Sequence, residues 1–278
     1  MRKWIFIVFL LLSAGVFSQE QDVFDALSRL DSAIISSTED FSPRDAYFLG
    51  RAVAAHILGQ YPIYTARPAL TRYLNMICTT IAINSPVPDW YNGYQVMLLD
   101  SDIFIAFSTP GGHIFLSRSL VEQAASEDML AAVIAHELAH IQLMHSLSGI
   151  RQDRLIQELT REQRRIAIQT EMEIALFSGS VNDIVNTLFS GGYSQQQELE
   201  ADLRAMALLA SAGYNPGSLI EMLRILERFE TNHHNSLQNT HPPPALRINA
   251  LEQQSARFRA QDTRSSRQNR FNRIRTGP

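Results

Sequence analysis

The sequence predicts an α+β domain that is mostly α-helical, with a small β-sheet placed directly before one central helix. Three observations favour this fold class. Apolar residues recur with helical spacing over 43–59 and 67–84, the pattern then alternates with a period of two between 94 and 116, and a long apolar run follows over 129–141. The chain of 278 residues is 45% hydrophobic, enough for a substantial core, and we see no linker or repeat that would divide it.

The first 18 residues have the organisation of a secretory signal peptide. A charged start precedes an apolar run over 4–12, and Ser18 is a small residue at the expected cleavage position. The apolar run is short for a membrane span, although an uncleaved signal that anchors the chain is the alternative. The single cysteine cannot form an internal disulfide, and exported proteins without a disulfide are common in the bacterial periplasm. We therefore expect cleavage near Ser18 and a periplasmic protein.

The remaining elements follow from local patterns. Ser126 is expected to cap the central helix, with Glu127 and Asp128 in its first turn, where the helix dipole favours negative charge. A turn at 109–112 is expected between the last two strands. The other expected elements are a helix over 22–37, strands over 94–99, 103–107 and 113–116, a polar helix over 150–175 and a more apolar stretch over 176–190.

The central helix carries an HExxH motif formed by His136, Glu137 and His140. Two histidines four residues apart on a helix are separated by about 40° around its axis, so they can bind one metal ion, and imidazole suits zinc. Glu137 lies beside the pair and can take a proton from a metal-bound water. The alternative is a solvated polar face. The apolar flanks argue against it, because buried His and Glu need partners.

A catalytic zinc ion needs a third protein ligand. A metzincin site would place Gly and His three and six residues after His140, but these positions hold Leu143 and Ser146, so that arrangement is excluded. His145 is close in sequence. On a continuous helix, however, it would point about 140° away from His140, so we expect it to form hydrogen bonds elsewhere.

A later helix offers a better third ligand. Glu198 and Asp202 are four residues apart and therefore share one helix face, and an apolar run follows them. Glu198 is the candidate ligand, and Asp202 can accept a hydrogen bond from a liganding imidazole. Glu200 fits the alternative, a solvated helix start.

At this point the sequence resembles the gluzincin metallopeptidases of the HtpX, CAAX prenyl protease and BepA type. The matching segments, in order, are TPGGHIFLSRSL, SEDMLAAVIAHELAHIQLMH, YSQQQELEAD, SAGYNP and THPPPALRI, within a looser similarity over 43–253. The resemblance implies a zincin-type fold with one Zn²⁺ per chain, Glu137 as general base and Asp202 beside a ligand. The zinc ligands that it implies are His136, His140 and Glu198.

The resemblance also implies that His241 lies near the metal, either as an inhibitory fourth ligand or as a group that stabilises the oxyanion. The chain departs from the family at Ile105, where the family often has Asn, and at Gln195, where it often has Arg; these departures concern substrate-backbone contacts and local ion pairs, not zinc binding. We see no membrane spans after the signal and no C-terminal tetratricopeptide array, so we expect a minimal soluble member.

Three segments are expected: the signal peptide over 1–18, a metallopeptidase domain over 19–253 and an arginine-rich tail over 254–278. The tail has few apolar residues and is predicted to be mostly disordered; it is either solvated or in weak contact with an anionic membrane surface. The net charge of −4 dictates no partner, and we expect no nucleic acid.

We predict a zinc metalloendopeptidase that hydrolyses unfolded or misassembled cell-envelope proteins, in contact with the outer-membrane assembly machinery. An extended substrate is expected to add to an edge strand that contains Gly112, His113, Ile114 and Phe115. The alternatives are a chaperone-like binder of outer-membrane proteins with latent proteolysis, and a processing protease of narrow specificity.

Overall fold

The computed structural model describes residues 43–147, 185, 192–232, 241, 243–258 and 264–276. The predicted signal peptide, the helix expected over 22–37, and nearly all of the two segments expected between 150 and 190 lie outside this part of the chain. The elements, in chain order, are α2 (Pro43–Gln60), α3 (Pro68–Ile83), β1 (Gln95–Leu99), β2 (Ala106–Ser108), β3 (His113–Ser117), α4 (Arg118–Gln123), α5 (Glu127–Gln142), α8 (Gln195–Ser211), α9 (Gly217–Asn232), α10 (Pro244–Gln254), a 3₁₀ turn (Ser255–Arg257) and α11 (Arg264–Thr276).

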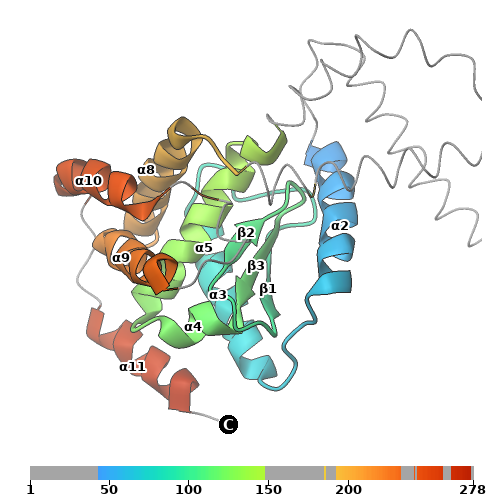
Figure 1. The fold of residues 1–278 in the computed structure, drawn as a ribbon, viewed down its shortest axis with the longest axis horizontal. Helices are drawn as coiled ribbons and strands as arrows, with labels where there is room; N and C mark the ends of the chain where they lie inside the picture. The colour runs from blue at the N-terminus through green and yellow to red at the C-terminus, as the bar shows by residue number, and fades with distance from the viewer. Residues whose placement is uncertain are drawn as a thin grey trace, which may run out of the picture.

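The described chain confirms the predicted α+β class, with a three-stranded sheet among many helices. Figure 1 shows α5 between the sheet and the group formed by α8, α9 and α10, while α2 lies on the opposite side of the sheet. Helix α3 packs against both β1 and α5. Within the described residues, no helix is both long enough and apolar enough to cross a membrane.

Helix α5 is the centre of the core, and the predicted Ser126 cap is confirmed. The Ser126 hydroxyl accepts a hydrogen bond from the backbone N–H of Met129, at 3.2 Å. Every residue from Glu127 to Ile141 is buried, so the helix is covered on all sides. The functional side chains on α5 therefore occupy a site that excludes bulk water.

The sheet has the strand order β1-β3-β2, and this corrects the predicted substrate-binding edge. Strand β3 pairs in parallel with β1, where Gln95 lies opposite His113, and antiparallel with β2, where Phe107 lies opposite Phe115. Residues 113–116, expected at an edge, therefore form the central strand, whose backbone groups are already used on both sides. Strand β2 is also shorter than expected, because it begins at Ala106 instead of 103.

Gly112 lies directly before β3 and shows why this turn needs glycine. Its φ is +91°, in the left-handed region that favours glycine, and a Cβ atom would lie 2.4 Å from the carbonyl oxygen of Gly93. His113 is buried. Its Nδ1 lies 3.1 Å from the Thr109 hydroxyl oxygen, and its ring stacks against the ring of Tyr47. These contacts give His113 a structural role at the start of β3.

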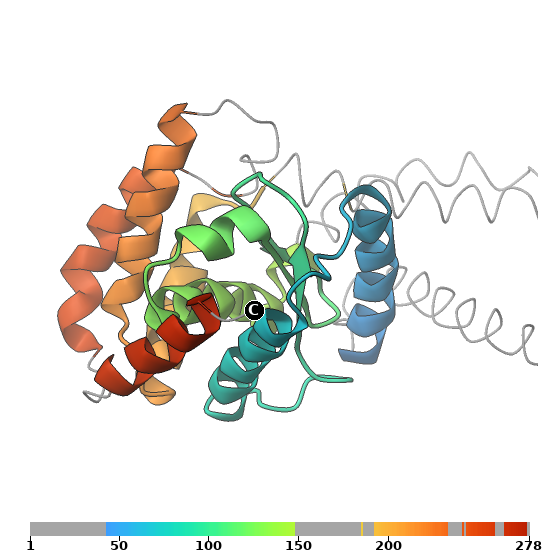
Figure 2. The ribbon, with the colours of Figure 1, turned by 90° about the horizontal axis from the view of Figure 1, so that it is seen from below.

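The C-terminal tail is not disordered as predicted, because residues 264–276 form α11. Figure 2 shows this helix beside α3, at the end of the chain. Arg267 forms an ion pair with Asp128 at 2.9 Å, and Arg270 pairs with Glu127. Both acids are buried in the first turn of α5, so ion pairs with the core hold a tail in which apolar residues are few. Composition alone does not reveal this kind of support.

Candidate metal centre

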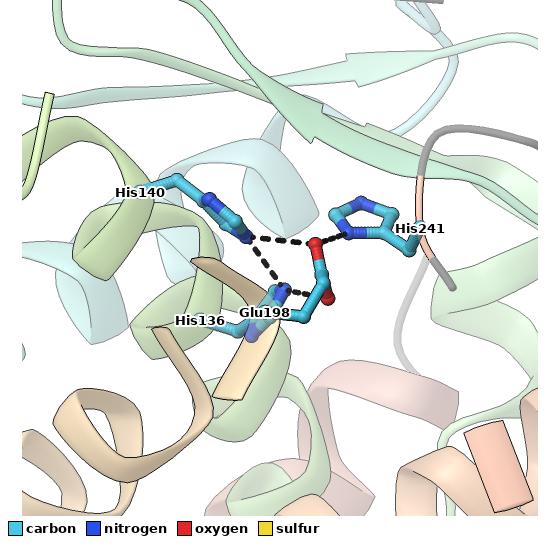
Figure 3. A group of neighbouring side chains, drawn as sticks. All are labelled: His136, His140, Glu198 and His241. Atoms are coloured by element: carbon cyan, nitrogen blue, oxygen red, sulfur yellow. Dashed lines mark hydrogen bonds and ion pairs between the residues drawn. The ribbon is translucent and has the colours of Figure 1, made fainter. Parts of the chain in front are cut away.

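His136 and His140 project from one face of α5, as their spacing predicts. Their Nε2 atoms are 3.1 Å apart, and the two rings are nearly perpendicular, at 81°. Both side chains are buried. Figure 3 shows the two rings converging on Glu198, which comes from a different helix.

Glu198 and Asp202 lie on α8, one turn apart. A capping box starts this helix, in which Ser194 and Gln197 satisfy each other's backbone N–H groups. The Glu198 carboxylate lies 3.3 Å from Nε2 of His140 and 3.6 Å from Nε2 of His136. Asp202 lies on the outer side of the first imidazole, with Oδ1 at 3.0 Å from Nδ1 of His136. The structure therefore brings together the four residues His136, His140, Glu198 and Asp202.

His241 completes a group of four metal-binding side chains. Its Nδ1 is 2.5 Å from Oε1 of Glu198, and its Nε2 is 3.8 Å from Oε1 of Glu137. One ligand atom from each of His136, His140, Glu198 and His241 lies within 4.8 Å of the other three. His241 therefore lies next to the other candidate ligands, as the resemblance implies.

Arg247 is a site residue that the sequence reasoning missed. It lies on α10, is 7% exposed, and donates two hydrogen bonds to Asp202, at 2.8 and 2.6 Å. A third nitrogen lies 2.9 Å from Oε2 of Glu198. One guanidinium thus neutralises two buried carboxylates, as its planar set of donors allows. The signal was present in the segment THPPPALRI, where Arg247 follows His241 by six residues.

His145 lies beside the cluster, against our expectation that it points away. Its Nδ1 is 3.0 Å from Nδ1 of His140, and its Nε2 is 3.4 Å from Oε2 of Glu200. The physical reason is that α5 ends at Gln142 and Met144 adopts a φ of +54°, which turns the chain back. The angle calculated for a continuous helix therefore does not apply.

Glu137 combines burial with an oxygen that has no hydrogen-bond partner. The side chain is 1% exposed, and its Oε2 accepts no hydrogen bond from any described residue. Its backbone carbonyl accepts a hydrogen bond from the Ser108 hydroxyl of β2, at 3.2 Å. A buried carboxylate oxygen without a partner is costly, and such atoms are often explained by a reaction or by an unseen water or ion.

The charges of the cluster depend on each other. Burial alone would raise the pKa of Glu198, but the positive charges of His241 and Arg247 outweigh it and hold this pKa well below its usual value. Burial also opposes ionisation of Asp202, yet Arg247 lowers the pKa of that carboxyl. Burial holds the pKa of His140 well below its usual value, which favours the neutral imidazole that binds metals.

The donor set fits a zinc ion. Two neutral imidazoles and one carboxylate are the three protein ligands of one common type of catalytic zinc site. The close approach of two Nε2 atoms and a carboxylate oxygen is explained if all three donate to one cation between them. Asp202 also meets the requirement that a liganding imidazole be held through its other nitrogen.

An apolar pocket opens beside this cluster. His136, Glu137, His241 and Arg247 line one part of it. The rest is apolar and comes from the start of β2 and the residues before it, and from α4, α5 and α9, with Phe104, Ile105, Ala106, Leu120, Val133, Leu219, Met222, Leu223 and Leu226. The pocket therefore joins the candidate metal centre to a surface that suits a large apolar side chain.

A buried HExxH helix, a glutamate from a second helix and a small preceding sheet define a metallopeptidase. The sequence matches the model of peptidase family M48 over residues 68–255, and the chain belongs to this family. The match begins at α3 and ends just after α10, so it includes every candidate ligand.

Relatives of the chain carry compatible names at low identity. It is 24% identical to the beta-barrel assembly-enhancing protease of Yersinia pestis over 276 residues, which is 95% of this chain and 54% of that protein. It is 27% identical to the metalloprotease LoiP of Escherichia coli K12, over 66% of this chain and 71% of LoiP. It is also 27% identical to the mitochondrial metalloendopeptidase OMA1 of Arabidopsis thaliana, over 58% of this chain and 31% of OMA1. The chain thus spans about half of the first relative's length.

Proposed function

We propose that this protein is a zinc-dependent endopeptidase whose zinc ion is held by His136, His140 and Glu198, one ion per chain. The observation that carries the proposal is the convergence of these three side chains beside the buried Glu137, whose Oε2 has no hydrogen-bond partner among the described residues. When bound, zinc would polarise the scissile carbonyl and acidify a water molecule. Residues of the chain carry out the other steps of peptide hydrolysis.

Glu137 has the position of the general base. Its buried carboxylate lines the pocket together with His136 and His241, so a water in this space would lie within its reach. The carboxylate takes a proton from that water and later gives the proton to the leaving amine. Ser108 holds the backbone at Glu137, and so links the position of the base to strand β2.

The substrate is proposed to lie along β2, not along β3. Strand β2 is an outer strand of the three, and it packs against α5. An extended peptide that added to this strand would pass the metal centre and could place a side chain in the apolar pocket. The departure from the family at Ile105, directly before β2, falls in the same region.

The proposed substrates are unfolded or misassembled proteins of the cell envelope. Two features support this proposal: the signal-like start of the sequence, and the similarity to a protease whose name refers to β-barrel assembly. An extended binding mode also favours polypeptides that are not folded, because a strand can add to a sheet only when its backbone groups are accessible.

The test uses purified protein without the first 18 residues. We expect one zinc per chain by elemental analysis and cleavage of casein, an unfolded substrate. Glu137→Gln should keep the zinc and lose the cleavage, because Gln preserves the shape of the side chain but cannot accept the proton. Retention of cleavage in this variant would reject Glu137 as the base. Binding of casein without cleavage by both the wild-type protein and His241→Ala would favour a chaperone-like binder instead.

A further inference from the structure

Each of the two imidazoles on α5 has one nitrogen inside the cluster and one outside. For His136 the outer nitrogen, Nδ1, meets the Asp202 carboxylate at 3.0 Å. For His140 the outer nitrogen meets another imidazole, His145, at 3.0 Å between the two Nδ1 atoms. The two candidate ligands are therefore supported in different ways.

The support of His140 continues to an acid on α8. Nε2 of His145 lies 3.4 Å from Oε2 of Glu200, and the other oxygen of this carboxylate accepts a hydrogen bond from Gln196 at 2.7 Å. Glu200 is two residues from Asp202. Helix α8 therefore reaches both imidazoles, directly through Asp202 and indirectly through Glu200 and His145.

The positions of the ring protons follow from this chain of contacts. A neutral imidazole that donates its Nε2 lone pair to a metal carries its proton on Nδ1. Nδ1–H of His140 must then donate to His145, whose Nδ1 must accept. The proton of His145 is therefore on Nε2, where the Glu200 carboxylate can accept it. Each residue in this series of contacts, from His140 through His145 to Glu200, thus has a donor or acceptor role that matches its neighbour.

The local fold holds His145 in this place. The left-handed Met144 turns the backbone, and the His145 carbonyl oxygen accepts a hydrogen bond from the Gln197 side chain at 3.4 Å. On another side of His140, the Tyr193 ring stacks at 3.9 Å between ring centroids and 16° between ring planes. The ring of His140 is thus held by a stacking partner and by a hydrogen-bond partner.

We propose that His145 is a positioning residue for His140: it accepts the Nδ1–H hydrogen bond, fixes the tautomer that presents Nε2 to the metal, and is itself oriented by Glu200. The proposal deepens the proposed zinc site and rests on it. Partners of this kind typically change metal affinity by about 10–100-fold when they are removed.

The test measures the zinc affinity of the whole mature chain by competition with a chelator. His145→Leu keeps most of the volume but removes the acceptor, and its zinc affinity should fall about 10–100-fold. His145→Asn places an amide oxygen near the position of Nδ1 and should recover most of the affinity. Glu122→Gln, which changes an exposed acid paired with Arg118, is the control and should bind zinc like the wild type.

A second measurement reports the tautomer. In the zinc-loaded wild type, ¹⁵N-edited NMR of the ring nitrogens should show a slowly exchanging proton on Nδ1 of His140, and His145→Leu should lose it. Equal zinc affinities of the wild type and His145→Leu would overturn the positioning role, as would equal losses in His145→Leu and His145→Asn. Zinc binding without casein cleavage in both the wild type and His241→Ala would instead overturn the proposed function.

Discussion

The charge balance of the metal centre depends on Arg247. Its guanidinium is the buried cation that contacts both Glu198 and Asp202. Removing one partner of a buried ion pair leaves an uncompensated charge, which costs about 3–5 kcal/mol. We therefore expect Arg247→Leu to lower the free energy of unfolding of the metal-free protein by about this amount, measured by urea denaturation.

The matched control is Arg224→Leu. Arg224 pairs with Glu252 between α9 and α10, but both side chains are about half exposed, so the loss should be about 0–1 kcal/mol. Similar losses in the two variants would show that Arg247 contributes no more than a surface ion pair does.

His241 has two alternative roles that predict opposite signs. As a fourth metal ligand it would exclude the reacting water, so His241→Ala should raise basal casein cleavage. As a donor to the oxyanion it would assist the reaction, and its removal should lower the rate by about 10²–10³-fold. We propose the inhibitory role, because His241 already contacts Glu198 at 2.5 Å within the ligand group. A large loss of activity would make it catalytic.

Sequence reasoning identified the residues whose spacing is regular and missed those whose place depends on irregular backbone or on the packing of distant helices. The pairs His136 with His140 and Glu198 with Asp202 follow from the helix repeat alone. The position of His145 could not be calculated, because it depends on one residue with positive φ after the end of the helix. Arg247 was missed because its partners lie on another helix, and only the fold brings them together.

Helix α11 shows how an element can be stabilised without an apolar face. Arg267 and Arg270 reach the buried acids Asp128 and Glu127. The buried residues of the helix itself are Arg267 and Phe271. Tyr73 also donates a hydrogen bond to Glu127, at 2.7 Å, so the receiving site is built into the core. The segment was predicted to be disordered because it has few apolar residues.

We expect Arg267→Met to lower the free energy of unfolding by about 3–5 kcal/mol, because it leaves Asp128 buried without its ion-pair partner. Urea denaturation measures the loss. Arg273→Gln changes an exposed arginine of the same helix and should stay within about 0.5 kcal/mol of the wild type. If the two variants were equally stable, α11 would be an independent tail and not a part of the domain.

The order of strands is a property of the whole molecule that local patterns do not contain. The three strands were predicted in nearly the right places, but β3 lies between β1 and β2. This order depends on how the strands pack against α2 and α3, which precede them in the sequence, and against α5, which follows them. It decides which strand a substrate can reach, and it moves the proposed substrate path from β3 to β2.

The pocket also combines segments from across the chain, so its shape is a property of the whole molecule. Val133 lines the pocket four residues before Glu137, on the same face of α5. A larger side chain there should fill space that we propose for the substrate residue next to the cleaved bond. Val133→Phe should therefore lower the ratio of kcat/KM for a large over a small apolar residue at this position by about 10-fold or more.

Cleavage of a peptide library, followed by mass spectrometry of the products, measures this ratio. Val121→Phe is a matched control, because Val121 is equally buried on α4 but does not line the pocket, so its preference should equal that of the wild type. Zinc content separates a changed preference from a damaged site. If Val133→Phe kept its zinc and the wild-type preference, the substrate side chain would lie elsewhere, and the pocket beside Glu137 would serve only as part of the core.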